Sequence, residues 1–197
     1  MTGAPEGLFR VLHVCTGNIC RSPMAEHLMR EGLRQRLGPE ADAFVVESAG
    51  TWGHTGSPME GFAHSTLAGF EIDGSAFTAR ELVAEHVAAA DLVLTATRDH
   101  RAAAVVLQPR AAKRTFTLRE FDRLLSVVDP ATLPAGDRVE RARALVAAAA
   151  ANRGMVRPDV PGDDDLADPY QAPESAFAAC AQLVHGTLQR PLDLLAG

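Results

Sequence analysis

A strand-like segment, a short polar loop and a helix-like segment follow one another near the start of the chain, and this unit limits its possible folds most strongly. Residues 9–15 read Phe-Arg-Val-Leu-His-Val-Cys, which is typical of a buried strand. Residues 16–21 form a polar turn, and the next two residues suit the N-cap and the first position of a helix. We therefore predict a helix from Ser22 to about Leu37, behind the first strand of an α/β fold.

Strand-like and helix-like segments alternate along the rest of the chain. Apolar runs predict strands at residues 44–48, 91–96 and 114–118. Helical patterns occupy residues 58–69, 79–90, 98–107, 137–152 and 174–188. This alternation predicts βαβ units and a parallel sheet. In the last helix, four residues recur at helical spacing and are expected to face the sheet: Phe177, Cys180, Val184 and Leu188.

The length of the chain fits one compact domain. Its 197 residues, 47% of them hydrophobic, can bury a substantial core, so we expect a single domain at 1–197. The stretch 129–168 interrupts the alternation with several prolines, an alanine-rich helical piece and three consecutive aspartates at 163–165. We expect residues 130–165 to be an insertion in this domain.

Charge and cysteine usage exclude several classes of function. The net charge is -6 and no block of five or more like charges occurs, so we expect no nucleic-acid or membrane partner. Residues 1–7 lack a signal-peptide pattern and no long apolar run follows, which predicts a cytoplasmic protein. The three cysteines, Cys15, Cys20 and Cys180, fit neither a disulfide framework nor a zinc site. We expect no metal and no cofactor.

The loop from Cys15 to Ser22, with sequence Cys-Thr-Gly-Asn-Ile-Cys-Arg-Ser, predicts an anion-binding site. A loop between a strand and a helix N-terminus can turn its backbone N–H groups inward, and the helix dipole adds positive potential. The same field favours the thiolate of Cys15, which makes this residue a nucleophile at neutral pH. The sequence therefore predicts a phosphate-binding loop with a cysteine at its base.

Other residues of the loop are expected to bind the phosphate or to stabilise the loop and the Cys15 sulfur. Arg21 can grip two phosphate oxygens with its planar guanidinium group. Gly17 permits unusual backbone angles, Asn18 is expected to fix the loop, and Ser22 can donate its hydroxyl to the Cys15 sulfur. The remaining residues of the loop are expected to line the bound phosphate: Thr16, Ile19 and Cys20.

At these residues the chain resembles the low-molecular-weight protein tyrosine phosphatases. The family motif V-C-x-G-N-x-C-R-S-P is matched by residues 14–23 without a gap, and further likeness occurs at residues 48–50, 90–94, 115–121 and 168–170. The resemblance implies a three-layer fold with a four-stranded, twisted parallel sheet and helices on both faces. It also implies a protein tyrosine phosphatase in which Cys15 attacks phosphotyrosine in a substrate protein, forming a phosphocysteine intermediate.

The resemblance also implies a general acid in an Asp-Pro pair, and two such pairs occur here. Asp168-Pro169 is followed by Tyr170 and then by the last helix, as in the family. Asp129-Pro130 lies closer in sequence to Cys15, at a distance nearer to that of shorter family members. We favour Asp168, because another helix and an acidic loop follow Asp129.

Aromatic residues are expected at the rim of the site, and Trp52 and Tyr170 are the candidates. Where many family members have a histidine that supports the loop asparagine, this chain has Phe77, so its support is expected to differ. His13 lies two residues before the nucleophile, but we interpret it as a core residue. Cys20 lies close enough in sequence to Cys15 to suggest a reversible, protective disulfide.

Two other activities remain open. Arsenate reductases of one family share this fold and loop, but they typically have glutamine where this chain has Pro23, and they use further cysteines. Phosphoarginine phosphatases have a threonine in the loop where this chain has Ile19. A third alternative is a phosphate-dependent binding module whose insertion recognises a partner.

Overall fold

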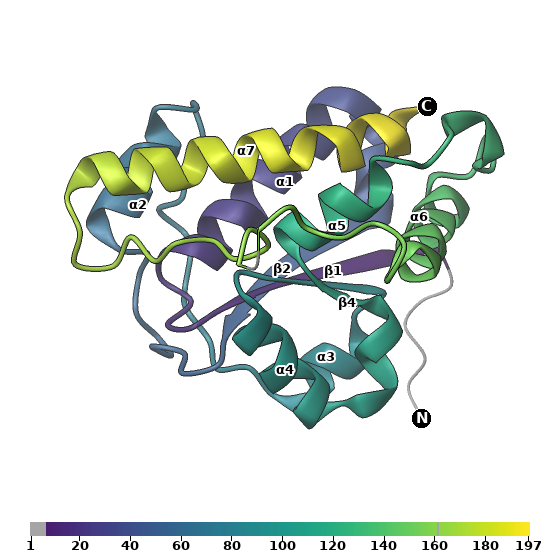
Figure 1. Ribbon diagram of the computed structural model, residues 1–197. Coiled ribbons are helices and arrows are strands. Elements are labelled where there is room, and N and C mark those ends of the chain that lie inside the picture. The colour runs from purple at the N-terminus through teal and green to yellow at the C-terminus, as the bar shows by residue number, and fades with distance from the viewer. Residues whose placement is uncertain (1–6, 161) are drawn as a thin grey trace.

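The computed structural model describes residues 7–160 and 162–197 and shows a four-stranded parallel sheet between two layers of helices (Figure 1). The strand order is β2-β1-β3-β4, and every pairing is parallel. The predicted fold class is therefore confirmed. Residues 1–6, where the sequence shows no signal-peptide pattern, lie outside the described residues.

The elements follow one another in strand-helix alternation. The strands are β1 (Phe9–Cys15), β2 (Phe44–Gly50), β3 (Leu92–Thr95) and β4 (Thr115–Thr117). The α-helices are α1 (Arg21–Leu37), α2 (Gly61–Ala68), α3 (Ala84–Ala89), α4 (Arg98–Leu107), α5 (Leu118–Leu125), α6 (Arg138–Asn152) and α7 (Glu174–Ala196). Short 3-10 helices occupy Gly38–Ala43, Pro109–Arg114 and Pro130–Thr132.

The two faces of the sheet bury separate apolar clusters. In Figure 1, α7 crosses above the sheet over α1, α2 and α5, whereas α3 and α4 lie below it. The larger cluster includes Met24, Phe116 and Phe177, and the smaller one includes Leu12 and Val93. Because β1 is covered on both sides, its residues are nearly all buried, as expected for a strand in a parallel sheet.

The carboxyl ends of the strands meet at one edge, and this edge positions the site. The register pairs Cys15 with Gly50 and Val14 with Thr95, so the loops that follow β1, β2 and β3 begin side by side. β2, the next strand in the chain, lies on one side of β1, and β3 lies on the other side. In open α/β sheets, ligands bind at such a switch point.

Several predicted boundaries were wrong by a few residues. Helix α1 begins at Arg21 with Cys20 at the N-cap and no side-chain cap, whereas we predicted a start at Ser22. Helices α2 and α3 are shorter than predicted, and α7 continues through Pro191 to Ala196. The extension of α7 is stabilised by apolar residues of its last turns, which are buried in the larger cluster.

Helix α5 was missed, although its start is marked in the sequence. The side chain of Thr117 accepts from the backbone N–H of Glu120 at 3.0 Å, and the Glu120 carboxylate accepts from the N–H of Thr117 at 3.2 Å. This reciprocal pair is a capping box, whose T-x-x-E pattern predicts a helix start.

No helix among residues 7–160 and 162–197 is long and apolar enough to cross a membrane.

Candidate active site

The loop between β1 and α1 lines a pocket of about 230 Å³. Cys15 is at the end of β1, Arg21 is the first residue of α1, and Asp168 reaches the same pocket from the segment before α7. The full lining is Cys15, Thr16, Gly17, Ile19, Cys20, Arg21, Trp52, His54, Asp168 and Tyr170. Residues more than 145 positions apart in the sequence therefore meet in one pocket.

The sulfur of Cys15 has a hydrogen-bond partner in Ser22. The Cys15 Sγ and Ser22 Oγ atoms are 2.9 Å apart, and both residues are buried. Asn18 Nδ2 donates to Ser22 Oγ at 2.9 Å. Because that amide supplies a proton to the Ser22 oxygen, the hydroxyl's own proton is free to point at Cys15. Ser22 is thus placed to stabilise a thiolate.

A buried hydrogen-bond network holds Asn18. Its Nδ2 also donates to Ser48 Oγ at 2.8 Å, and its Oδ1 accepts from the backbone N–H of Arg80 at 2.9 Å. Asn18 is fully buried and has a positive φ of 56°, a conformation that asparagine tolerates better than most residues. Ser48 in turn donates to the carboxylate of Glu26 at 2.5 Å.

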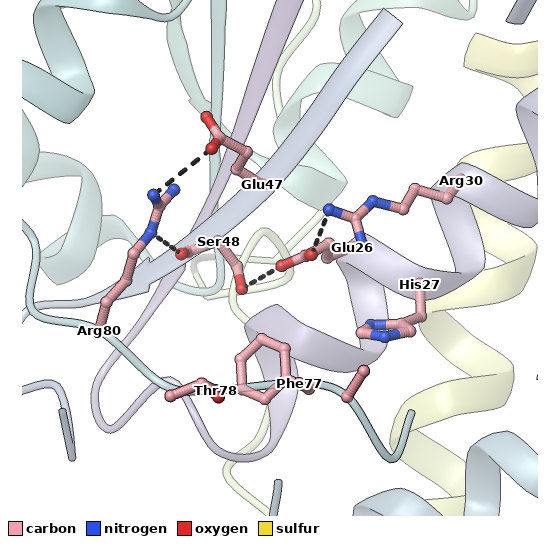
Figure 2. Close-up of a pocket in the computed structure, with 9 residues that line it drawn as sticks. Glu26, His27, Arg30, Glu47, Ser48, Phe77, Thr78 and Arg80 are labelled. Atoms are coloured by element: carbon pink, nitrogen blue, oxygen red, sulfur yellow. Dashed lines mark hydrogen bonds and ion pairs between the residues drawn. The ribbon is translucent and has the colours of Figure 1, made fainter. Parts of the chain in front are cut away.

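Glu26 anchors this network on the side away from Cys15. Figure 2 shows its carboxylate between Ser48 and Arg30, and the Glu26–Arg30 pair measures 2.7 Å. Phe77, which we expected to change the support of Asn18, packs against the His27 ring with centroids 5.8 Å apart. The support of Asn18 therefore comes from Ser48 and the Arg80 backbone.

The segment after β2 fixes the backbone of the loop. The N–H groups of Thr51 and Trp52 donate to the carbonyls of Cys15 and Thr16, both at 2.9 Å. This close approach requires Gly50, because a Cβ there would lie 2.4 Å from the Thr16 carbonyl oxygen. The loop carbonyls thus face this segment. The N–H groups of residues 17–20 donate to no carbonyl in the described part of the chain.

Arg21 is buried, with an exposed fraction of 4%, and lines the pocket. Its Nη2 donates to Asp168 Oδ2 at 2.6 Å and to Thr16 Oγ1 at 3.2 Å, and its Nη1 donates to the Leu166 carbonyl at 3.2 Å. Its Nε is buried and has no partner among the described residues. One donor of the Arg21 guanidinium is therefore left without a hydrogen bond among the described residues.

His100, which sequence reasoning missed, supports the loop from α4. Its Nε2 lies 2.9 Å from Thr16 Oγ1, and its Nδ1 lies 2.7 Å from Thr97 Oγ1. Burial and the nearby charge of Arg21 lower the pKa of His100. The available sequence signal was its place just after β3, whose carboxyl end lies beside that of β1.

The two Asp-Pro pairs occupy different places. Asp168 lines the pocket and its Oδ1 accepts from the backbone N–H of Tyr170 at 3.2 Å. Asp129 is exposed and accepts from the N–H of Ala131 at 3.0 Å, as the cap of a 3-10 helix. Only Asp168 shares a pocket with Cys15.

Aromatic side chains flank the mouth of the pocket. Trp52 is 81% exposed and Tyr170 is 48% exposed, although both line the pocket. His54 is exposed and lines the pocket as well. Together with Ile19 these residues give the opening an apolar wall, suited to a flat ring.

Comparison with known proteins identifies the family of this chain. Residues 10–153 match the family described as low molecular weight phosphotyrosine protein phosphatase, which is well over half of the chain. The chain belongs to this family.

Two curated relatives carry the names of different kinds of phosphatase. The chain is 41% identical over 129 residues to low molecular weight protein-tyrosine phosphatase A of Mycobacterium tuberculosis, covering 61% of this chain and 74% of that protein. It is 38% identical over 113 residues to a protein-arginine-phosphatase of Geobacillus stearothermophilus, covering 57% of this chain and 71% of that one. Both tyrosine and arginine phosphatases are therefore relatives.

Solved structures of family members show the same fold. A low molecular weight protein tyrosine phosphatase from T. tengcongensis has a TM-score of 0.68 at 27% identity, covering 94% of this chain and 98% of the other. The YwlE arginine phosphatase from Geobacillus stearothermophilus has a TM-score of 0.66 at 28% identity, covering 94% and 91%.

Two other buried titratable residues, His13 and Cys180, are neutral at pH 7. Burial and the charge of Arg30 lower the pKa of His13 to about 3, and its Nε2 lies 3.3 Å from Met29 Sδ. Burial raises the pKa of Cys180 to about 11. His13 is therefore a core residue, and no cluster of three potential metal ligands occurs among the described residues.

The predicted Cys15–Cys20 disulfide can be tested by oxidation. Both cysteines are buried and free, and burial together with the neighbouring Cys15 raises the pKa of the Cys20 thiol to about 12. Peroxide is therefore expected to oxidise Cys15 first, to a sulfenic acid, which condenses with the Cys20 thiol and releases water. Mass spectrometry after mild peroxide should detect the crosslink in the wild type and Cys15 sulfonic acid in Cys20→Ser. Sulfonic acid on Cys15 without a crosslink in the wild type would contradict the prediction.

Proposed function

We propose that this phosphatase hydrolyses phosphotyrosine in proteins through a phosphocysteine intermediate on Cys15. The observation that carries the proposal is the convergence of Cys15, Arg21 and Asp168 on one pocket with aromatic residues at its mouth. We further propose that the chain is one cytoplasmic domain that needs no metal or cofactor, with residues 130–165 as an insertion.

In the first step the Cys15 thiolate attacks phosphorus, and the bond from phosphorus to the tyrosine oxygen breaks. The N–H groups of the loop and the Arg21 guanidinium hold the phosphoryl oxygens. To bind a phosphoryl oxygen, the Arg21 Nη2 atom must either donate to that oxygen and to Asp168 together or give up its 2.6 Å hydrogen bond with Asp168. Asp168, protonated at this stage, donates its proton to the leaving phenolate.

In the second step the Asp168 carboxylate takes a proton from water, whose oxygen attacks phosphorus. The bond between sulfur and phosphorus then breaks and releases inorganic phosphate. The Ser22 hydroxyl, 2.9 Å from the sulfur, stabilises the departing thiolate by donating to it. Asp168 is protonated again at the end and is ready for the next turnover.

Phosphoarginine is the second candidate substrate, because an arginine phosphatase is among the relatives at 38% identity. Two features favour tyrosine. Ile19 gives the pocket an apolar wall without a hydroxyl to bind a guanidinium nitrogen, and Trp52 and Tyr170 offer faces to a phenyl ring. Arsenate reduction is less favoured, because Cys15 and Cys20 alone among the described cysteines line the pocket.

A substrate panel with one loop variant tests this assignment. The wild type is expected to hydrolyse a phosphotyrosine peptide at least about 10-fold more efficiently in kcat/KM than a phosphoarginine peptide. Ile19→Thr should shift that ratio towards phosphoarginine, because it adds a hydroxyl where Ile19 is apolar. Greater wild-type activity on phosphoarginine would overturn the tyrosine assignment, and arsenate reduction without phosphatase activity would overturn the reaction.

A further inference from the structure

The three aspartates at 163–165, which the sequence suggested only as an acidic loop, lie just before Asp168, and two of them are bound by arginines. Asp164 is bound by Arg123 of α5, and Asp165 is bound by Arg98 of α4. We call these two ion pairs the arginine clasp. The segment they hold connects α6 with α7 and crosses the molecule past α5 (Figure 1).

The inner pair of the clasp is largely shielded from solvent. Arg123 Nε donates to Asp164 Oδ1 at 3.0 Å and Nη2 donates to Oδ2 at 2.7 Å, so the pair is bidentate. The Asp164 side chain is 12% exposed and that of Arg123 is 21% exposed. Arg123 Nη1 also donates to the carbonyl of Val156 in the same connection. One side chain thus fixes two points of this segment to α5.

The outer pair fixes the next residue to the start of α4. Asp165 Oδ1 accepts from the backbone N–H of Arg98 at 2.8 Å, and Oδ2 accepts from its Nη2 at 3.0 Å. Leu166 follows, with a buried side chain and an N–H that donates to the carbonyl of Ala96 at 2.8 Å. Its own carbonyl accepts from Arg21.

We propose that Arg98 and Arg123 are positioning residues that set the place of the Asp168 carboxylate relative to Cys15. Only two residues separate Asp165 from Asp168, so a fixed Asp165 leaves the Asp168 carboxylate a small range of positions. A shift of about 1 Å at a reacting group can lower a rate by about 100-fold. This inference rests on the proposed role of Asp168 as general acid.

The test uses two aryl phosphates that differ in how much they need an acid. Phenyl phosphate releases a basic phenolate and depends strongly on proton donation, whereas 4-nitrophenyl phosphate releases a weakly basic one. The measured quantity is the ratio of kcat/KM for the two substrates. Because this ratio does not depend on the concentration of active enzyme, partial unfolding of a variant does not change it.

Asp164→Asn removes the charge that Arg123 binds. We expect it to lower kcat/KM for phenyl phosphate about 10-fold more than for 4-nitrophenyl phosphate. In an Asp168→Asn background the same change should alter the ratio less than about 2-fold, because no acid remains to be misplaced. If Asp164→Asn fails to fold, Arg98→Gln tests the same effect at the more exposed pair.

Asp193→Asn is the matched control. Asp193 of α7 forms an ion pair of 2.8 Å with Arg36 of α1 and does not line the pocket. The substitution therefore removes an ion pair away from the site. Its substrate ratio should equal that of the wild type. An unchanged ratio in both Asp164→Asn and Arg98→Gln, with a changed ratio in Asp168→Asn, would overturn the clasp alone. An unchanged ratio in Asp168→Asn would overturn the proposed acid, and with it the basis of the inference.

Discussion

Replacing Cys15 with serine is expected to lower phosphotyrosine hydrolysis by about 10⁴-fold or more, because Cys20, the other thiol that lines the pocket, has a pKa raised to about 12 and stays protonated. The serine hydroxyl stays protonated at neutral pH, and neither Ser22 nor Asn18 is placed to act as a strong base towards it. Steady-state kinetics with a phosphotyrosine peptide measures the loss.

Two measurements show that this loss is chemical. The Cys15→Ser variant retains Arg21 and the loop, so millimolar inorganic phosphate should still raise its melting temperature. Cys180→Ser, the same substitution on α7 outside the pocket, should keep activity within about 3-fold of the wild type. Substantial turnover by purified Cys15→Ser would show that Cys15 is not the nucleophile.

Asp168→Asn is expected to lower kcat/KM for phosphotyrosine by about 100-fold or more, because asparagine cannot donate a proton to the leaving phenolate. The side chain keeps its shape, so the contact with Arg21 can be kept by the amide oxygen. The loss should therefore appear in the rate of the chemical step. Single-turnover kinetics, which separate binding from chemistry, measure it.

Asp129→Asn is the control, with the same substitution in the other Asp-Pro pair. Asparagine caps short helices as well as aspartate does, and Asp129 lines no part of the pocket. Activity and stability should both remain close to those of the wild type. A large loss in Asp129→Asn with little change in Asp168→Asn would move the acid to the earlier segment.

Local sequence was sufficient to predict the loop and the elements next to it. β1 coincides with its prediction, and Cys15 and Arg21 lie at the ends of the loop as expected, because their spacing fixes them on either side of one turn. The same local reasoning misplaced the start of α1. The backbone carbonyl of Cys20 already accepts from Met24, so the helix begins before the residues best suited to its cap.

Contacts between distant segments were much less visible in the sequence. Glu26 supports the loop through Ser48 of β2, and His100 of α4 supports it through Thr16. Both contacts form only when β1 pairs with β2 and β3. The residue types of Glu26 and His100 carry no pattern of their own, since a buried glutamate or histidine is identified by its partners. The sequence context already favoured Asp168 over Asp129, and the structure places the Asp168 side chain in the pocket beside Cys15.

The sequence by itself determined the chemistry available to this protein. A cysteine at the end of a strand and an arginine at the start of the next helix make an anion site together with the loop between them. Strand, loop and helix are neighbours along the backbone, so local sequence is enough to predict this site. Tertiary structure decided where the Asp168 carboxylate, which the sequence favoured, lies relative to Cys15 and Arg21. That outcome depends on how α4 and α5 bind residues 164 and 165, through contacts between segments that are about 40 to 70 positions apart in the chain.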